Sequence, residues 1–192
     1  MTKGQSLPDD ATIRSIAARI DRPLVLVGMM GVGKSTIGRK LANVLGMRFT
    51  DADDEIVKAA AMPIVDIFDR FGEEYFRDGE KRVIARIMDS ARGDCVIATG
   101  GGAFVQPETR ALILEQGIAI WLDAEVETLV ERVQRNDRRP LVNDGDTHAI
   151  VTEMKKKRGA ADAEAPIHIR SDRGPHNSAV KRILEALDQW LT

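Results

Sequence analysis

The chain has 192 residues, the length of one ordinary domain, and its 28 basic and 30 acidic side chains nearly cancel. The resulting net charge of −2 argues against nucleic acid or an anionic membrane surface as the main partner. A single cysteine excludes an internal disulfide framework, and no apolar run approaches the ~20 residues of a membrane span. We therefore expect a soluble, cytoplasmic protein.

Helical and strand-like segments alternate along the chain. A short helix capped by Asp9 or Asp10 is expected to run to about residue 20, so that residues 1–22 form an added N-terminal arm. The continuous apolar run 24–27 is typical of a strand buried on both faces. Further strands are predicted at 49–51, 96–99, 119–122 and 167–169. Helices are predicted at 34–45, 54–91 (two helices, with turns near 62–63 and 71–72), 107–116, 125–136, 147–162 and 176–191.

This alternation indicates parallel βαβ units. The sequence therefore predicts an α/β fold over residues 23–192, a three-layer α/β/α domain whose central sheet has about five parallel strands. Such sheets bind ligands at the carboxyl ends of their strands. Cys95 begins an apolar run and is expected to be a buried structural thiol. No exposed apolar stripe stands out, which favours a monomer.

Residues 28–35, Gly-Met-Met-Gly-Val-Gly-Lys-Ser, match the phosphate-binding pattern G-x-x-x-x-G-K-[ST] completely, and Thr36 follows. The match comes after a buried strand and opens a helix, which is the context that this chemistry requires. Glycines let backbone N–H groups surround phosphates, and the helix N-terminus adds positive potential. Lys34 offers a charge to the β- and γ-phosphates, and Ser35 offers a hydroxyl to Mg²⁺. We expect a site for ATP with Mg²⁺.

Two acidic residues follow the second predicted strand. In an extended segment Asp51 and Asp53 would point to one face. Asp51 can then hold Mg²⁺, usually through water, while Asp53 orients an acceptor hydroxyl and takes its proton. The alternative is that both carboxylates cap the next helix, as Asp54 and Glu55 are expected to do.

Three further features have a functional and a structural interpretation. Gly100-Gly101-Gly102 after a strand allows close approach of a ligand, or forms a flexible turn. Arg77 on a helix can bind an anion, or pair with Glu73 or Glu80. Arg138-Arg139-Pro140-Leu141 can close over ATP and stabilise the transferring charge, or form an ordinary surface loop.

Taken together and in this order, these features resemble shikimate kinase. The phosphate loop alone is shared with many kinases, whereas the Asp-x-Asp, Phe-Arg and triple-glycine set at these separations is much more specific. The resemblance extends from about residue 23 to 190. The matching stretches are 28–36, 49–53, 67–80, 98–103 and 138–141.

The resemblance implies a P-loop kinase fold like that of nucleoside monophosphate kinases, and transfer of the γ-phosphate of ATP to the 3-hydroxyl of shikimate in aromatic amino-acid biosynthesis. It implies Mg²⁺ held by Ser35 and, through water, by Asp51. Arg139 would reach the phosphates from a mobile lid at about 136–147, with Arg132 near the adenine and Arg173 in the 171–175 turn flanking it. The phosphate-binding residues would be Gly31, Val32, Gly33, Lys34, Ser35 and Thr36.

On the acceptor side, the resemblance implies that Asp53 binds the shikimate hydroxyls and acts as the base. Arg77 and Arg158 would bind the carboxylate, and Gly101 and Gly102 would contact the ring hydroxyls. The chain departs from the family after Arg158, where Pro-Leu-Tyr is replaced by a segment containing two acids, Asp162 and Glu164. Either the helix runs on and swings Arg158 away, or Asp162 pairs with it.

This departure keeps two other functions open. A related kinase could act on another small polyol, such as gluconate or a cyclitol, and a neutral acceptor would not need both arginines. A non-catalytic ATP-binding module would bind nucleotide without transferring phosphate. Asp53 argues against the non-catalytic module, because a protein that only binds nucleotide does not need a base for an acceptor hydroxyl.

Overall fold

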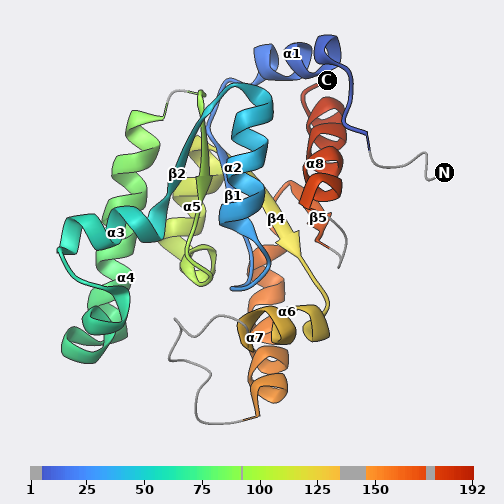
Figure 1. Cartoon of the computed structure of the whole chain (residues 1–192). Coiled ribbons are helices and arrows are strands. Elements are labelled where there is room, and N and C mark those ends of the chain that lie inside the picture. Colours follow the sequence, from blue (N-terminus) through green and yellow to red (C-terminus); the bar gives the residue numbers. More distant parts are fainter. Residues whose placement is uncertain (1–5, 92, 135–145, 172–175) are drawn as a thin grey trace.

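The computed structural model describes residues 6–91, 93–134, 146–171 and 176–192, which form a parallel sheet enclosed by helices (Figure 1). The strands are β1 (Leu24–Val27), β2 (Arg48–Asp51), β3 (Cys95–Ala98), β4 (Ile118–Asp123) and β5 (Ile167–Arg170). The helices are α1 (Asp10–Arg19), α2 (Lys34–Leu45), α3 (Ala52–Ala60), α4 (Ile64–Ser90), the 3-10 turn η1 (Ala103–Val105), α5 (Pro107–Gln116), α6 (Val126–Gln134), α7 (Thr147–Asp162) and α8 (His176–Trp190).

The sheet has the order β2-β3-β1-β4-β5, and every neighbouring pair is parallel. Strand β1 lies at the centre and is buried along its whole length, as its unbroken apolar run predicts. Strand β2 lies at one edge and is exposed or half-buried. The predicted five-stranded parallel sheet is thus confirmed, and the order brings the carboxyl ends of β1, β2 and β3 to the same side.

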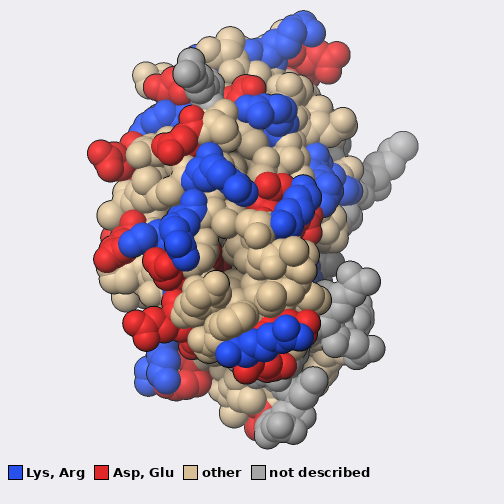
Figure 2. Space-filling model, turned by 90° about the vertical axis from the view of Figure 1, so that its left-hand side faces the viewer, with Lys and Arg blue, Asp and Glu red and all other residues tan. Residues whose placement is uncertain are grey.

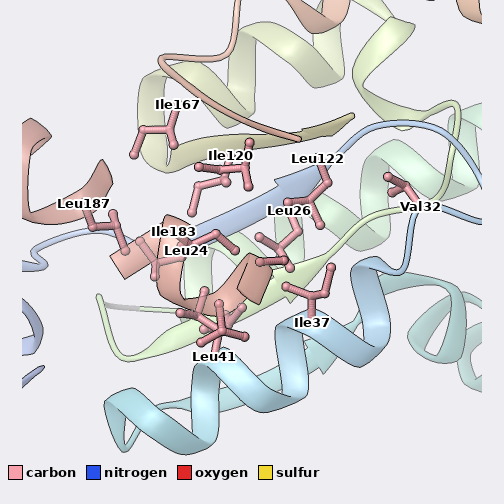
Figure 3. Close-up of a cluster of buried hydrophobic side chains, with 14 of the residues drawn as sticks. Leu24, Leu26, Val32, Ile37, Leu41, Ile120, Leu122, Ile167, Ile183 and Leu187 are labelled. Atoms are coloured by element: carbon pink, nitrogen blue, oxygen red, sulfur yellow. The ribbon is translucent and has the colours of Figure 1, made fainter. Parts of the chain in front are cut away.

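Two hydrophobic clusters hold the three layers together. On one face of the sheet Leu24 and Leu26 pack with side chains of α2 and α8 (Figure 3), and α1 adds Ile16 to the same cluster. On the other face Val25 and Val27 pack with side chains of α3, α4 and α5. The alternation along β1 divides its side chains between the two clusters, because successive residues of a strand point to opposite faces.

Helix α1 begins where the sequence predicts. The Asp9 carboxylate caps it by accepting a hydrogen bond from the Thr12 amide at 2.8 Å. Ile16 is fully buried in the cluster formed with α2 and α8, and Arg19 pairs with Asp188 of α8. Helix α1 therefore packs against α2 and α8, which cover one face of the sheet. The division of the chain into an arm and a domain at residue 22 stays a prediction.

The segment between β2 and β3 holds the expected two helices, with the predicted turn before Ile64 and a break at Gly72, and differs only at the start of the first helix. Helix α3 begins earlier, at Ala52, and α4 then continues to Ser90 through a kink at Gly72, whose φ of 81° and ψ of 174° are non-helical. Glycine adopts this positive φ without the strain a side chain would add. The kink separates an apolar first part of α4 from the part that carries Arg77 and Glu80.

Among the described residues, none of the helices is long and apolar enough to cross a membrane. On the side of the molecule that carries α3 and α4, basic and acidic side chains are interspersed (Figure 2). The sole cysteine, Cys95, is buried, in agreement with the sequence analysis.

Truncating the core on the α2 side should be costly. Leu41 is fully buried against β1 and α8, so Leu41→Ala is expected to lower the free energy of unfolding by about 2–5 kcal/mol. Asn43→Ala, at an exposed position of the same helix, should change it by less than about 0.5 kcal/mol. Denaturant unfolding of both variants measures the difference. Equal losses in the two would contradict the burial of Leu41.

Candidate active site

The phosphate loop joins β1 to α2 at the centre of the sheet. Gly33 forms the N-cap of α2 with a φ of 99°, a left-handed conformation that favours glycine. Val32 is buried, whereas Ser35 and Thr36 are exposed in the first turn of the helix. The loop therefore presents its backbone and two hydroxyls to solvent at the positive end of a helix, as anion binding requires.

Lys34 is 7% exposed and lies under this loop. Its ammonium group donates hydrogen bonds to the carbonyl oxygens of Gly28 and Met29, at 2.8 and 2.9 Å. These bonds hold the charge next to the loop. A phosphate placed in the loop would therefore compete with two carbonyls for this ammonium group.

Neighbouring elements fix the loop in place. Arg132 of α6 donates to the carbonyl of Val32 at 3.1 Å, and the buried Ser171 hydroxyl donates to the same oxygen at the same distance. The structure thus brings Arg132 to the phosphate loop. Arg139 and Arg173 lie outside the described residues, as does the predicted lid up to residue 145, while Thr147 already belongs to α7.

The acidic pair is arranged differently from the sequence-based expectation. Asp51 ends β2 and is the N-cap of α3, where its carboxylate accepts from the Asp53 amide at 3.1 Å. Asp53 belongs to the first turn of α3 and not to the strand, so the expectation of an extended segment with both side chains on one face was wrong. The capping alternative holds for Asp51, whereas Asp54 and Glu55 lie in the first turn of α3 and pair with Arg39 and Lys58.

A cavity of about 820 Å³ lies beside the phosphate loop. Its polar lining is provided by Asp53, Arg77, Glu80 and Arg158, with the backbone of residues 100–102. The apolar part of the lining comes mainly from α3 and α4, and consists of Met30, Val57, Pro63, Ile64, Val65, Phe68 and Phe76. Asp69 completes the set. The volume is that of a small-molecule site.

Arg77 forms the ion pairs of its structural interpretation and also lines the cavity, so that anion binding by this residue stays a prediction. Its guanidinium donates to Glu80 at 2.6 Å and to Glu73 at 3.2 and 3.3 Å, and it also lines the cavity. Glu80 is 1% exposed, and burial raises the pKa of its carboxyl although Arg77 opposes this shift. Its Oε1 atom accepts no hydrogen bond within the described part of the chain. The ion pair thus fixes Arg77 against a buried carboxyl.

Arg158 reaches the same cavity from α7. Its guanidinium donates to the Gly101 carbonyl at 2.6 Å and lies 3.5 Å from the Met29 sulfur. Burial, together with the charge of Arg77, lowers the pKa of the guanidinium, which remains protonated because an arginine pKa starts so high. Helix α7 does run on to Asp162, but Arg158 is not turned away from the cavity.

The triple glycine makes room for site side chains. A Cβ atom on Gly100 would lie 2.4 Å from Glu80, one on Gly101 would lie 2.9 Å from the Met30 nitrogen, and one on Gly102 would lie 2.6 Å from Arg77. Larger residues here would push apart the groups that line the cavity. Glycine is therefore needed here for the approach of the protein's own groups, and the approach of a ligand to this backbone stays a prediction.

Two parts of this site are not predicted by the sequence. Glu80 was considered only as a surface partner of Arg77, yet it is among the most buried charged residues described. The signal was its spacing, three residues after Arg77 on one helix. The apolar wall of α3 and α4 gave no separate signal, because its residues are indistinguishable from core positions in sequence.

Comparison with known proteins identifies the family. The family model for shikimate kinase matches residues 30–188. The shikimate kinase of Novosphingobium aromaticivorans is 55% identical over 193 residues, covering 100% of both chains. That of Caulobacter vibrioides is 53% identical over 168 residues, covering 88% of this chain and 83% of its own.

A solved structure supports the same assignment. Shikimate kinase from Acinetobacter baumannii in complex with shikimate superposes with a TM-score of 0.82 at 32% identity, over 88% of this chain and 95% of that one. Full-length similarity in sequence, agreement in fold, and a cavity flanked by a phosphate loop all lead to one conclusion: the chain belongs to the shikimate kinase family.

Proposed function

We propose that this site transfers the γ-phosphate of ATP to the 3-hydroxyl of shikimate, giving shikimate 3-phosphate and ADP. Membership of the family makes the chain an ATP-dependent phosphotransferase. The observation that carries the proposal is the cavity, which combines a carboxylate, Asp53, with two guanidinium groups, Arg77 and Arg158. Shikimate is a small ring with hydroxyl groups and one carboxylate, so it needs both kinds of partner.

Arg77 and Arg158 would both bind the carboxylate of the acceptor, but they differ in how they are held. Arg77 is held by Glu80 and Glu73, so its direction is fixed before the acceptor arrives. Arg158 has no carboxylate within 4.0 Å in the described part of the chain and donates to one carbonyl. Its remaining N–H groups can therefore donate to both oxygens of a carboxylate. Gly101 and Gly102 would let the ring hydroxyls approach the backbone.

On the nucleotide side, residues 31–36 would bind the phosphates. Lys34 would exchange its two carbonyl partners for the β- and γ-phosphates, which gives it a charged partner in place of neutral ones. Arg132 would lie at the adenine side of the loop. Arg139, from the predicted lid, and Arg173 would complete the site.

Mg²⁺ fits the oxygen donors that the chain offers. Among the described residues no group of three or more His, Cys, Asp and Glu side chains could hold a metal by itself. Mg²⁺ commonly binds through one or two protein oxygens together with substrate phosphates. Ser35 and Asp51 would be those protein ligands, Asp51 through water. When bound, the ion would neutralise part of the phosphate charge.

The transfer would depend on position and electrostatics more than on covalent chemistry. The acceptor hydroxyl oxygen forms the new bond to the γ-phosphorus. The bond to the β,γ-bridging oxygen breaks, and ADP leaves with its electron pair. Asp53 aims the hydroxyl and takes its proton, while Lys34 and Arg139 stabilise the charge on the transferring group. We also propose that the enzyme acts as a cytoplasmic monomer.

The test is ATP turnover in a coupled ADP assay with Mg²⁺, comparing shikimate, gluconate and no acceptor. Shikimate is expected to raise ADP release by more than about a hundredfold over the rate without acceptor, because positioning supplies most of the catalysis. Stimulation by gluconate and not by shikimate would favour the polyol alternative. ATP binding without transfer to either compound would favour the non-catalytic module.

A further inference from the structure

Asp162, the last residue of α7, is an acidic side chain with no role in the proposed reaction. It is 4% exposed, although an aspartate is rarely buried unless it is paired. No described residue forms a side-chain hydrogen bond or an ion pair within 4.0 Å with its carboxylate. The pairing with Arg158 that the sequence suggested is therefore absent, and the burial of this charge is compensated only at longer range.

The charged groups that act on this carboxyl come from several elements. Arg158 lies on the same face of α7, one turn earlier, and Lys34 belongs to the phosphate loop. Asp123, at the end of β4, adds a negative charge, and Arg110 of α5 adds a positive one. Asp123 in turn pairs with Lys155, and Arg110 pairs with Glu164.

The other elements packed against α7 direct their charges elsewhere or carry none. The turn η1 consists of Ala103, Phe104 and Val105. From α6, Arg132 donates to the loop carbonyls, Glu127 faces His148, and Glu131 is exposed. The two cations that act most strongly on Asp162 thus belong to two different subsites, Arg158 to the acceptor cavity and Lys34 to the phosphate loop.

We propose that Asp162 is a positioning residue shared by the two subsites, which takes up a proton when anionic ligands bind to Arg158 and Lys34. A shikimate carboxylate on Arg158, or a phosphate on Lys34, offsets the positive charge that keeps Asp162 ionised. A nearby anion favours the neutral form of a carboxyl. The inference rests on the proposed function for its acceptor half, and on the phosphate loop alone for its nucleotide half.

The ionisation state of the free enzyme makes this uptake measurable. Burial raises the pKa of Asp162 to about 6, against the opposing effects of Arg158 and Lys34. The carboxyl is therefore mostly ionised at neutral pH and mostly protonated at pH 5. Because both ligands act on one proton site, the ligand that binds first makes protonation easier for the second. Binding of ATP and of shikimate should then be mutually favourable, since such coupling is reciprocal.

Calorimetric titration in two buffers of different ionisation enthalpy measures the protons taken up on binding. We expect ADP and shikimate, titrated separately at pH 7, each to cause uptake of roughly half to one proton at Asp162. At pH 5 this uptake should nearly vanish. Asp162→Asn keeps the shape of the protonated side chain, and in this variant the proton uptake should be lost at both pH values. Protons that ADP itself takes up or releases are the same for both proteins, so they cancel when the two measurements are subtracted.

A matched control is Glu153→Gln, which removes the same charge from an exposed position of α7 and should behave like the parent protein. Steady-state kinetics gives an independent readout. The KM for shikimate should rise by up to about tenfold between pH 5.5 and 7.5 in the parent protein and stay flat in Asp162→Asn, with little change in kcat. A purely structural role would not produce this difference in pH profile.

The proposal is overturned if Asp162→Asn and the parent protein take up equal numbers of protons with ADP, or with shikimate where it binds. If shikimate neither binds nor is phosphorylated by the parent protein, the proposed function has failed. In that case the ADP titration alone still decides the role of Asp162 at the phosphate loop.

Discussion

Asp53→Asn is expected to lower kcat by about 10²–10⁴-fold, the range for loss of a positioned general base. Asparagine keeps the size of the side chain and its hydrogen bonding, but it cannot accept the proton of the acceptor hydroxyl. Nucleotide binding should be unchanged because the phosphate loop starts from a different strand. The measurement is kcat in the coupled ADP assay, together with ADP affinity from calorimetry.

Asp54→Asn is the matched control. This neighbour carries the same charge in the same turn of α3, but its side chain is 63% exposed and faces Arg39 at 3.7 Å. Its replacement should leave kcat within about twofold, as expected of a surface position. If Asp53→Asn retained most of the activity, the base would have to be another group, and the proton transfer proposed for this site would be incorrect.

Arg158→Ala should raise the KM for shikimate by about 10²–10³-fold, since truncating one member of a buried charge pair costs several kcal/mol. The side chain comes from the helix that departs from the family pattern, but it still reaches the cavity and the Gly101 carbonyl. Arg158→Lys should recover only part of the affinity, because an ammonium group cannot match a carboxylate bidentately. Steady-state kinetics with varied shikimate measures both.

Lys157→Ala controls for the loss of a positive charge next to Arg158. Lys157 is 73% exposed and pairs with Glu153 on the outer face of α7, so its removal should leave the acceptor KM unchanged. A fall in kcat with an unchanged KM in Arg158→Ala would mean that this guanidinium acts on the transferring phosphate and not on the acceptor carboxylate.

Much of this molecule was predictable from local patterns. Three local patterns each predict a structural element and where it ends: the apolar run 24–27, the phosphate loop 28–35 and the triple glycine 100–102. An unbroken apolar run is typical of a buried strand, and the phosphate-loop pattern is typical of a turn between a strand and a helix. The five-stranded sheet followed from the alternation of strands with helices. The family resemblance then named the side chains that the structure brings to one cavity, Asp53, Arg77 and Arg158.

What could not be predicted depends on contacts between distant segments. The sequence allowed both an extended Asp53 and a helix cap at Asp51, and only the structure shows that Asp51 is the cap and that Asp53 lies in the first helical turn. The burial of Glu80 follows from the approach of Gly100, twenty positions later. The environment of Asp162 combines charges from α2, α5 and β4, so sequence proximity to Arg158 alone suggested an ion pair that does not form.

The unequal burial of the strands has a consequence for local opening. The phosphate loop is attached to β1, which is fully buried, whereas Asp53 and the cavity helices α3 and α4 follow β2, a half-exposed edge strand. The free energy needed to open a segment increases with the contacts it must give up. Amide hydrogens of β2 and α3 should therefore exchange with solvent through partial unfolding while those of β1 exchange only when the whole sheet unfolds. The segment β2–α3, which carries Asp53, can thus open locally while the phosphate loop attached to β1 stays folded.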